Sequence, residues 1–491
     1  MSKYEVVIGL EVHAQLKTVS KMFCTCDNMS VDAAPNTHVC PVCLGFPGML
    51  PVANKKAIEW TYMLGLALGG KVNDKWNFER KNYFYPDLPK AYQITSATNP
   101  PVIGGGLDVD DEGKLRKVRI HHIHLEEDAG KLVHPSGKNY SLVDLNRAGT
   151  PLMEIVTEPD LRSAREARIF MQDLRAILRY LGISDANLEQ GNMRCDANIS
   201  LRPVGQKEYG TRAEIKNINS FKMVERAIEY EIERQTEVLD SGEKVKQETR
   251  GWDDNKGKTL PQRSKEEAND YRYFPEPDLP PISQSGKNVI DIAAIQSMLP
   301  ELPKDKAARF VTEYGLSATD AAMLTSDLDT ARYFEQTLEE IPEIAGDSEI
   351  AKKKAKKIAN WILSELIAKI NVLNISISET KIKHSDLAAL TEMIDTGEIS
   401  GKIAKEVFSE MFETGKSPAI IIKEKGLVQI SDTSELEKVI TEVLAANEKS
   451  VNDFREGKQQ AFGYLVGQVM AKTRGQANPK IVNELLKEKL K

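Results

Sequence analysis

The chain has 491 residues, too many for a single hydrophobic core, and its length predicts roughly two to four domains. Its 66 Lys and Arg residues against 73 Asp and Glu residues give a net charge of −7, which argues against a protein coated in positive charge for nucleic-acid binding, although a local basic face remains possible. The first residues form a strand-like pattern without the features of a signal peptide, and the longest apolar run, 60–68, is well short of the roughly 20 residues of a membrane span. We therefore expect a soluble cytoplasmic protein without a membrane partner.

The first part of the chain, residues 1–292, is predicted to form a mixed, largely antiparallel β-sheet with helices. The segments VVIGLEVHAQL, KVRIHHIHL, YSLVDLN, NMRCDANISLRP and TRAEIKNIN all alternate polar and apolar residues with a period of two. At least two helices are predicted between them. The first begins at Ser163, with Glu166 as its capping-box partner, and ends at Gly182, and the second runs from near Ser220 toward Gly242.

Four of the five cysteines cluster near the start of the chain, as Cys24-x-Cys26 and Cys40-x-x-Cys43. Two thiolate pairs joined by a short loop suit tetrahedral zinc, and four cysteine ligands leave no open coordination position, so we predict a structural zinc knuckle at 24–43. The alternative is a set of reduced thiols without a metal. Cys195 falls on the apolar face of its strand and is interpreted as a small core residue.

Several of the predicted strands carry polar residues at every second position, which places those side chains on one face. One such strand alone is typical of a solvated sheet surface. If the strands are neighbours, their carboxylates converge with an imidazole and with basic side chains, which is the set that a Mg²⁺-assisted phosphoryl-transfer site requires. The residues of this set are Glu11, His13, Glu126, Asp196 and Glu214, with Arg194, Arg212 and Lys216.

Two loops, NYFYPDLPKAYQ at 82–93 and DYRYFPEPDLPP at 270–281, share an aromatic cluster followed by P-D-L-P. They are interpreted either as two proline-ordered loops packed by their aromatic rings or as a pair that frames one pocket. In the second case positive charge for a phosphate comes from Arg80, Lys81, Lys90 and Arg272.

The remainder of the chain is predicted to be helical. The Pro-rich segment 274–286 marks a boundary, the pattern from about Asp291 onward is helical, and a second break is predicted near 415–419. The fold class is therefore α+β: a sheet domain at 1–292, an all-α domain at 293–413 and a small helical tail at 414–491. From Arg455 onward the tail carries eight Lys and Arg residues against three Glu residues, a pattern typical of a solvated helix surface.

The motifs LVDLNRAGTPLMEIVTEPD, IGLEVHAQL, HLEEDAGK, RCDANISLRP, AEIKNINSF and DYRYFPEPDLPP closely resemble the GatB family, the B subunits of the tRNA-dependent amidotransferases, over essentially the whole chain. This resemblance implies ATP- and Mg²⁺-dependent phosphorylation of the side-chain carboxylate of misacylated Glu-tRNA(Gln) and/or Asp-tRNA(Asn), followed by amidation. The implied enzyme is a carbon–nitrogen ligase with glutamine as the amide donor. The implied partners are the amidase subunit GatA, the small subunit GatC and misacylated tRNA, in a heterotrimer.

The resemblance also implies roles for residues. The Mg²⁺ shell is expected from Glu11, His13, Glu126 and Glu214, with Glu127, Asp196 and Lys216 as further catalytic residues. Entrance or phosphate contacts are expected from Arg80, Lys81, Tyr83, Tyr85 and Lys90, and Arg194 and Arg212 are expected to bind substrate or phosphate. The cysteines resemble the zinc knuckle that some members keep, and the tail resembles a YqeY-like domain that contacts tRNA through backbone charge. His121 and His122 receive no role.

Two other functions are weighed against this one. The same carboxylates would suit a stand-alone Mg²⁺-dependent hydrolase of a small phosphorylated substrate, but a separate tRNA-binding domain would then have no purpose. A non-catalytic scaffold that binds zinc and tRNA would leave the polar strand faces as ordinary solvated surface.

Overall fold

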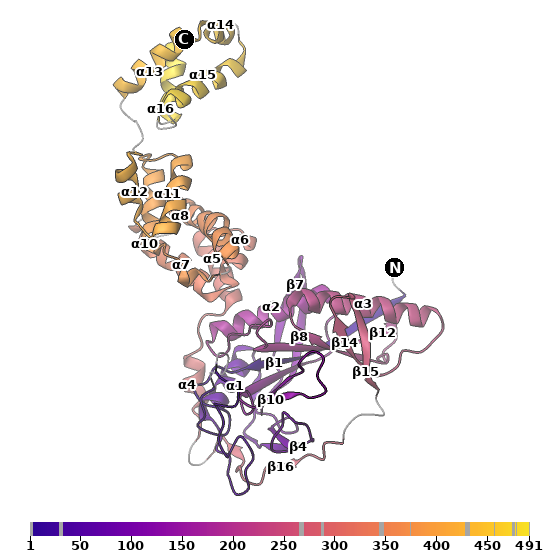
Figure 1. Ribbon diagram of the computed structural model, residues 1–491. Helices are drawn as coiled ribbons and strands as arrows, with labels where there is room; N and C mark the ends of the chain where they lie inside the picture. Colours follow the sequence, from indigo (N-terminus) through magenta and orange to yellow (C-terminus); the bar gives the residue numbers. More distant parts are fainter. Residues whose placement is uncertain are drawn as a thin grey trace. The chain divides into compact units, whose positions relative to one another are not determined.

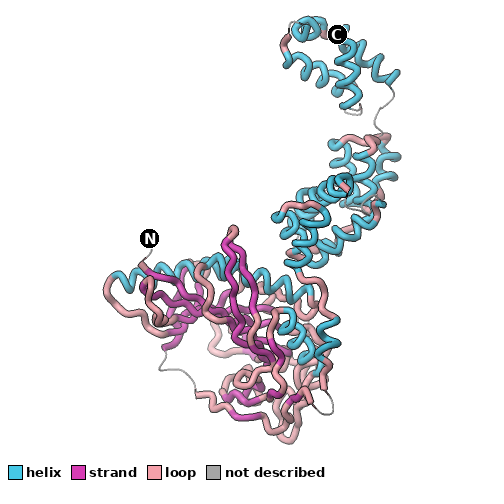
Figure 2. The backbone as a smooth tube through the Cα atoms, turned by 180° about the vertical axis from the view of Figure 1, so that it is seen from behind, coloured by secondary structure: helices cyan, strands magenta, loops and turns pink. Residues whose placement is uncertain are grey.

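The computed structural model describes residues 3–28, 33–264, 270–285, 289–342, 348–373, 375–427, 433–455, 457–473, 477 and 479–490. The described residues divide into two compact units, the first ending at Pro303 and the second beginning at Lys304 (Figure 1). All strands of the described residues belong to the first unit, and the second unit is helical (Figure 2). The predicted α+β class is therefore confirmed.

A sheet of 13 strands dominates the first unit, with the central order β15-β14-β13-β12-β1-β11-β8-β5-β4-β16. Its pairs are antiparallel except for the parallel pair β13/β14, so the sheet is mixed and largely antiparallel as predicted. The strands of this order are β1 (Tyr4–Gln15), β4 (Glu79–Asn82), β5 (Tyr92–Thr95), β8 (Lys114–Glu127), β11 (Pro151–Thr157), β12 (Met193–Pro203), β13 (Ala213–Ile218), β14 (Glu248–Asp253), β15 (Lys258–Ser264) and β16 (Phe274–Pro275). Branching from it are β2 (Lys71–Val72), β6 (Val102–Ile103) and β7 (Gly106–Asp111), and two small sheets pair β9 (Lys131–Val133) with β10 (Leu142–Asp144) and β3 (Lys75–Trp76) with β17 (Ile282–Ser283).

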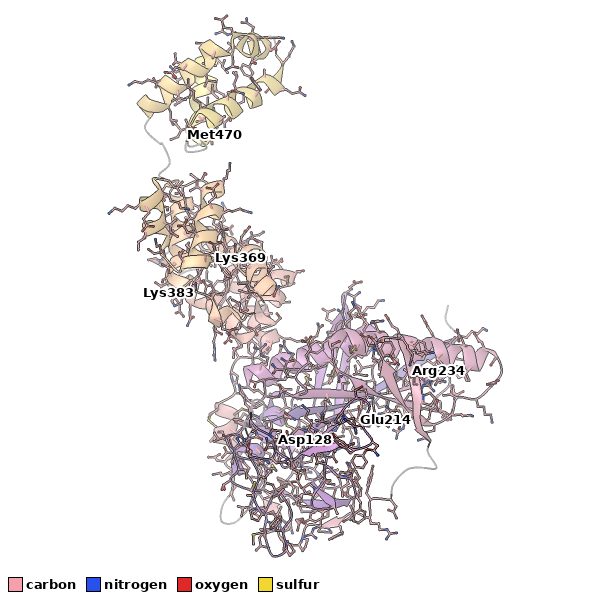
Figure 3. The ribbon with its side chains drawn as sticks, viewed as in Figure 1. Asp128, Glu214, Arg234, Lys369, Lys383 and Met470 are labelled. Atoms are coloured by element: carbon pink, nitrogen blue, oxygen red, sulfur yellow. The ribbon has the colours of Figure 1, made fainter. Side chains whose placement is uncertain are left out.

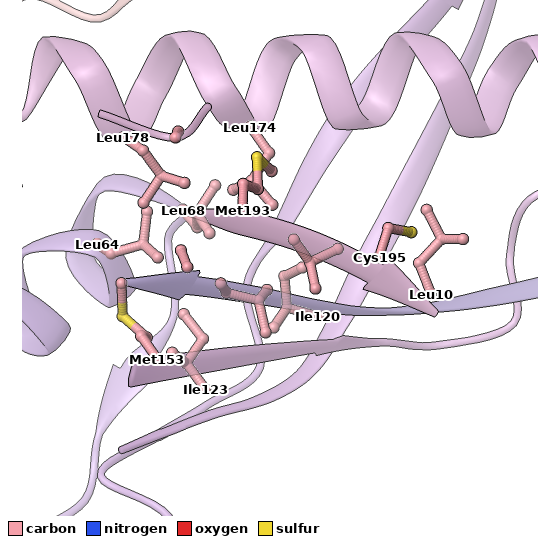
Figure 4. Close-up of a cluster of buried hydrophobic side chains, with 14 of the residues drawn as sticks. Leu10, Leu64, Leu68, Ile120, Ile123, Met153, Leu174, Leu178, Met193 and Cys195 are labelled. Atoms are coloured by element: carbon pink, nitrogen blue, oxygen red, sulfur yellow. The ribbon is translucent and has the colours of Figure 1, made fainter. Parts of the chain in front are cut away.

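One face of the sheet is apolar and packs against helices. Leu10 of β1, Met193 of β12 and Met153 of β11 are buried in a cluster with Leu174 and Leu178 of helix α2 (Ala164–Tyr180) (Figure 4). Helices α1 (Lys55–Ala67), α3 (Phe221–Asp240) and α4 (Ile292–Ser297) complete this layer. Each large aliphatic side chain buried in this way contributes about 1.5–3 kcal/mol to folding. Because side chains alternate along a strand, burial of one face leaves the intervening polar residues on the other.

The two predicted helices of this unit begin where their caps indicated. The Ser163 side chain accepts a hydrogen bond of 3.0 Å from the backbone N–H of Glu166, and Ser220 accepts one of 3.1 Å from Met223. The capping box at Ser163 is only half formed, because the Glu166 carboxylate accepts from the backbone N–H of Arg162, one residue before the cap.

The second unit contains two buried clusters of helices. The first is built from α5 (Pro303–Tyr314), α6 (Ala318–Thr325), α7 (Leu328–Glu339), α8 (Glu349–Asn360), a π-helical turn (Trp361–Leu366), α9 (Ile367–Leu373), the 3₁₀ turn Ile377–Glu379, α10 (His384–Asp395), α11 (Gly401–Thr414) and α12 (Pro418–Lys425). The second is built from α13 (Thr433–Ala446), α14 (Glu448–Arg455), α15 (Gln459–Lys472) and α16 (Pro479–Leu490). Ile295 belongs to the buried cluster of the sheet unit, and Ile421 and Ile422 belong to the first helical cluster, beyond the boundaries expected at 292 and 413. Among the described residues, no helix is long and apolar enough to cross a membrane.

Candidate active site

The strands that carry the predicted polar residues are neighbours, so their polar side chains converge on the face of the sheet away from α2. Glu11 of β1 lies opposite Asp196 of β12, and His13 lies opposite Arg194. This face forms the wall of a cavity of about 570 Å³, which we call the central cavity. Its lining includes Glu11, His13, Lys81, Tyr83, Gln93, Glu126, Asp128, Glu154, Arg194, Asp196, Glu214, Lys216 and Tyr271.

Glu154 of β11 stands at the centre of this face, although it was not among the predicted site residues. Its Oε2 lies 3.3 Å from Nε2 of His13 and 3.1 Å from Nε2 of His124. Burial opposes ionisation of Glu154, but the two imidazoles, His124 above all, hold its pKa well below the usual range. Burial likewise lowers the pKa of His124, yet Glu154 and Glu126 outweigh it and raise that pKa to about 10. The signal was present in the sequence as a lone acid in the otherwise apolar strand PLMEIVT.

The carboxylates of the central cavity, together with the His13 imidazole, form two sets that could each hold a metal ion. In each set the candidate ligand atoms lie within 4.8 Å of one another, the first set being His13, Glu126 and Glu154 and the second Glu11, Asp196 and Glu214. Of the four residues expected in one Mg²⁺ shell, His13 and Glu126 belong to the first set, and Glu11 and Glu214 belong to the second. Burial, then the charges of Glu154, Glu214 and Asp196, raise the pKa of Glu11. A divalent cation would relieve this repulsion between carboxylates, and oxygen ligands suit Mg²⁺.

Basic side chains lie beside these carboxylates. Lys216 forms ion pairs with Asp196 and, at 3.0 Å, with Glu214, and although burial lowers the pKa of Lys216, the two acids raise it above its usual range. The Lys81 ammonium stands 5.0 Å from the centre of the Tyr271 ring. The cavity therefore holds cations that can meet the oxygens of a phosphate or a carboxylate.

Arg194 is held at the cavity wall by Asp128, another acid that was not among the predicted site residues. Asp128 accepts hydrogen bonds of 2.9 Å from Nη2 of Arg194 and 2.7 Å from Nε2 of Gln15, and Arg147 lies 3.7 Å away. Burial favours the neutral acid, but Arg194 and Arg147 bring the pKa of Asp128 below its usual range. Figure 3 shows Asp128 and Glu214 on the side of the sheet away from α2.

Glu127 and Lys90, both expected in the site, form an ion pair with each other, and neither is among the residues that line the central cavity. Glu127 Oε1 also accepts a hydrogen bond of 3.0 Å from the backbone N–H of Ile94. The Glu127 carbonyl accepts one of 2.8 Å from the side chain of Gln93, which does line the cavity. The pair supports the wall from behind.

Arg80, Tyr85 and Arg212 also lie outside the cavity lining. Arg80 donates two hydrogen bonds, of 2.8 and 2.9 Å, to the carboxylate of Glu276, whose side chain is fully buried. Tyr85 is 54 % exposed and stacks on Tyr83 at the cavity edge, and Arg212 is exposed just before β13.

The two similar loops do frame the same cavity. Strand β16 pairs with β4, and the Asn82 side chain donates to the backbone carbonyls of Tyr271, at 3.1 Å, and Arg272, at 2.9 Å. Tyr83 from one loop and Tyr271 from the other line the cavity in edge-to-face contact. Of the four basic residues named for these loops, only Lys81 lines the cavity, and Arg272 is exposed and pairs with Asp270.

The four clustered cysteines fit a metal such as zinc. Their Sγ atoms all lie within 4.8 Å of one another, and those of Cys40 and Cys43 are 3.8 Å apart. A tetrahedral site with Zn–S distances of about 2.3 Å has S···S edges of about 3.8 Å. A hydrogen bond from Cys24, assisted by the Cys40 backbone and the nearby Lys21, brings the pKa of Cys43 down to about 5. Cys195 is buried in the sheet core, as predicted.

Comparison with known proteins identifies the family of this chain. Residues 6–290 match the family model described as the GatB/GatE catalytic domain, and residues 347–490 match the GatB domain. The chain belongs to the GatB family. It is 50 % identical over 496 aligned residues to the B subunit of the aspartyl/glutamyl-tRNA(Asn/Gln) amidotransferase of Carboxydothermus hydrogenoformans, covering 100 % of this chain and 99 % of that one. It is 53 % identical to the protein of the same name from Thermodesulfovibrio yellowstonii, with both chains fully covered.

The GatB family model for the C-terminal part begins at residue 347. It therefore spans part of the all-α region expected at 293–413 as well as the tail expected at 414–491. The catalytic-domain match, in turn, contains every residue of the central cavity and all four clustered cysteines.

A row of three histidines on β8 leads to the GatB cavity. His121 Nδ1 lies 2.6 Å from Nδ1 of His122, whose Nε2 lies 3.0 Å from Nδ1 of His124. Burial, then the neighbouring imidazoles, lower the pKa of His122 to about 4, so this ring is neutral at physiological pH. His122 and His124 line a second cavity of about 270 Å³, which shares Glu126 and Glu154 with the central one.

Proposed function

We propose that the chain is the catalytic GatB subunit of a tRNA-dependent amidotransferase. It uses ATP and Mg²⁺ to phosphorylate the side-chain carboxylate of misacylated Glu-tRNA(Gln) and/or Asp-tRNA(Asn), and the acyl phosphate is then amidated. The observation that carries this proposal is one cavity in which two sets of acidic ligands face Lys81, Lys216 and Arg194. The names of the full-length relatives support the choice of substrate.

The chemistry needs an activated carboxylate, because a free carboxylate has no leaving group. Transfer of the γ-phosphoryl group of ATP to one carboxylate oxygen forms an acyl phosphate and releases ADP. Ammonia then attacks the carbonyl carbon, the bond to the phosphate oxygen breaks, and a cavity carboxylate takes the proton that the nitrogen loses. Lys81, Lys216 and Arg194 orient the anionic groups before transfer, which lowers the barrier mainly through positioning and charge.

Mg²⁺, when bound, would neutralise charge on the phosphates. The residues that would hold it are those of the two acidic sets: His13, Glu126 and Glu154, and Glu11, Asp196 and Glu214. Zinc at the four cysteines would be structural, because no coordination position stays open.

The proposed enzyme is one part of a complex. Ammonia comes from glutamine through the amidase subunit GatA, and GatC completes the heterotrimer, which fits the word "subunit" in the relatives' names. The basic tail is proposed to contact the tRNA backbone. The whole complex constitutes the carbon–nitrogen ligase.

The test separates a kinase from a scaffold. We would measure Glu-tRNA-dependent release of phosphate from ATP by the assembled complex, with Glu11→Gln and Glu126→Gln as variants and Glu189→Gln, on an exposed turn, as the control. We expect a loss of about 100-fold or more in the first two variants and an unchanged rate in the control. Unchanged release in the first two would leave the non-catalytic scaffold as the function. Parallel assays with Asp-tRNA(Asn) identify the substrate.

A further inference from the structure

Lys21 is a charged side chain with no exposed surface. Its Nζ lies 3.4 Å from the carbonyl oxygen of Leu145 and 3.9 Å from Sγ of Cys43. No carboxylate of the described residues forms an ion pair with it, and the Glu127 carboxylate, whose Oε2 lies 3.8 Å from the position that a Cβ on Gly149 would take, is paired with Lys90. Burying an ammonium group costs free energy unless a negative charge lies beside it, so Lys21 requires a nearby anion.

The four cysteines supply it when they hold a metal. Four thiolates around one divalent ion carry a net charge of −2, and Cys43, whose Sγ lies 3.9 Å from the Lys21 ammonium, is itself buried. We propose that Lys21 is the counter-ion of a metal-loaded tetrathiolate centre and that its charge helps this chain to retain zinc. The proposal rests on the zinc assignment made above and not on the phosphorylation reaction.

The same contacts connect the cysteines with the central cavity. The backbone N–H of Met22, next to Lys21, donates a hydrogen bond of 2.7 Å to the Gly149 carbonyl, and the Gly149 N–H donates one of 2.9 Å to the carbonyl of Asp128. The Asp128 side chain holds Arg194 at the cavity wall. Lys21 thus lies in the segment that is hydrogen-bonded, through Gly149, to the residue that holds Arg194.

Gly149 allows these parts to meet. Its φ of +87° lies in the left-handed region that favours glycine, and a Cβ at this position would stand 3.5 Å from Cδ of Lys21 and 3.6 Å from Cβ of Cys43. The metal centre, the lysine and the cavity wall thus pack against one another in this one turn.

Zinc affinity of the full-length chain tests the charge directly. We would compare the unchanged protein with Lys21→Met, which keeps most of the length of the side chain but removes its charge, and with Lys17→Met, whose lysine is exposed and pairs with Asp185. Competition with a chromogenic chelator should show zinc held about 10- to 100-fold more weakly by Lys21→Met and equally by Lys17→Met. Cobalt(II) bands typical of four thiolates in Lys21→Met would show that the ligands are intact.

The outcomes separate the two assignments. An unchanged protein without zinc overturns the zinc assignment and the counter-ion with it. A zinc-binding protein whose Lys21→Met variant has the same affinity overturns the counter-ion alone.

A second measurement needs no substitution and tests the proposed counter-ion if Lys21→Met does not fold. Amide hydrogen exchange of the full chain is compared with and without zinc. The amides of Met22 and Gly149 should lose protection when zinc is removed, because the net charge of −2 on the metal-loaded thiolates beside Lys21 is then reduced, whereas the Val12 amide in the sheet should not change. Equal protection of Met22 and Gly149 in both states would overturn the proposal.

Discussion

Replacing Asp128 with Asn should destabilise the sheet unit through the loss of a buried charge. The side chain is 4 % exposed and accepts short hydrogen bonds from Arg194 and Gln15. Asn keeps the shape, but it presents an amide N–H₂ to these donors and leaves the Arg194 guanidinium without its counter-charge. Removing one partner of a buried ion pair costs about 3–5 kcal/mol. Because the Arg194 side chain is 39 % exposed, water offsets part of this loss, and we expect a decrease of about 2–3 kcal/mol.

Urea unfolding measures this decrease. In a Trp361→Phe background the remaining tryptophans, Trp60, Trp76 and Trp252, all lie in the first unit, so fluorescence reports that unit alone. The control is Asp185→Asn, an exposed partner of Lys17, which should change stability by less than about 1 kcal/mol. A decrease of less than about 1 kcal/mol for the Asp128 variant would refute the assignment of Asp128 as the buried counter-charge of Arg194.

The pH dependence provides an independent check. Because the folded-state pKa of Asp128 is lowered, its charge stabilises the protein above the unfolded value of about 3.9 and is lost as pH falls through the folded pKa. The difference between the unchanged protein and Asp128→Asn should therefore be constant from pH 5 to 8 and shrink below about pH 4. A difference that grows on acidification contradicts this account.

Three further outcomes are expected. Glu276→Gln should destabilise the first unit by about 3 kcal/mol in urea, because it breaks the bidentate contact of a fully buried carboxylate with Arg80, and an unchanged midpoint would contradict this. In Mg²⁺-free buffer the difference in unfolding free energy between the unchanged protein and His124→Gln should shrink from about pH 7 to 10, because the His124 imidazolium, whose pKa is raised in the folded state, loses its proton over this range. A difference that stays constant would contradict a stabilising charge on His124. Zinc chelation should lower the calorimetric melting temperature of the first unit and leave that of the helical unit unchanged, and equal shifts would argue against a structural knuckle.

Local patterns in the sequence were enough to predict the elements. The caps at Ser163 and Ser220 lie where their helices begin, and the alternation around Cys195 correctly separates the buried face of β12 from the polar one. These features depend on residues within a few positions of one another, because helical and strand periodicities are local. The spacing of the cysteines likewise predicted their cluster.

The partners of individual side chains were not predictable in this way. Lys90 and Arg80 were expected at a phosphate, but the fold brings Glu127 to the first and Glu276 to the second. Glu276 is separated from Arg80 by most of the first unit's sequence, and a periodic pattern contains no information on such distances.

The sequence by itself therefore determined the α+β class, the polar and apolar faces of each strand, and the chemistry of the residue types. The tertiary structure alone decided that β13, β12, β1, β11 and β8 are neighbours, which divides the acids into two sets around Glu11 and Glu154. The physical reason is that side-chain parity follows from one strand, whereas the order of strands follows from hydrogen bonds between distant segments and from burial of a common core. Lys21 shows the same limit: in the sequence it is an ordinary lysine, and only burial against Cys43 distinguishes it.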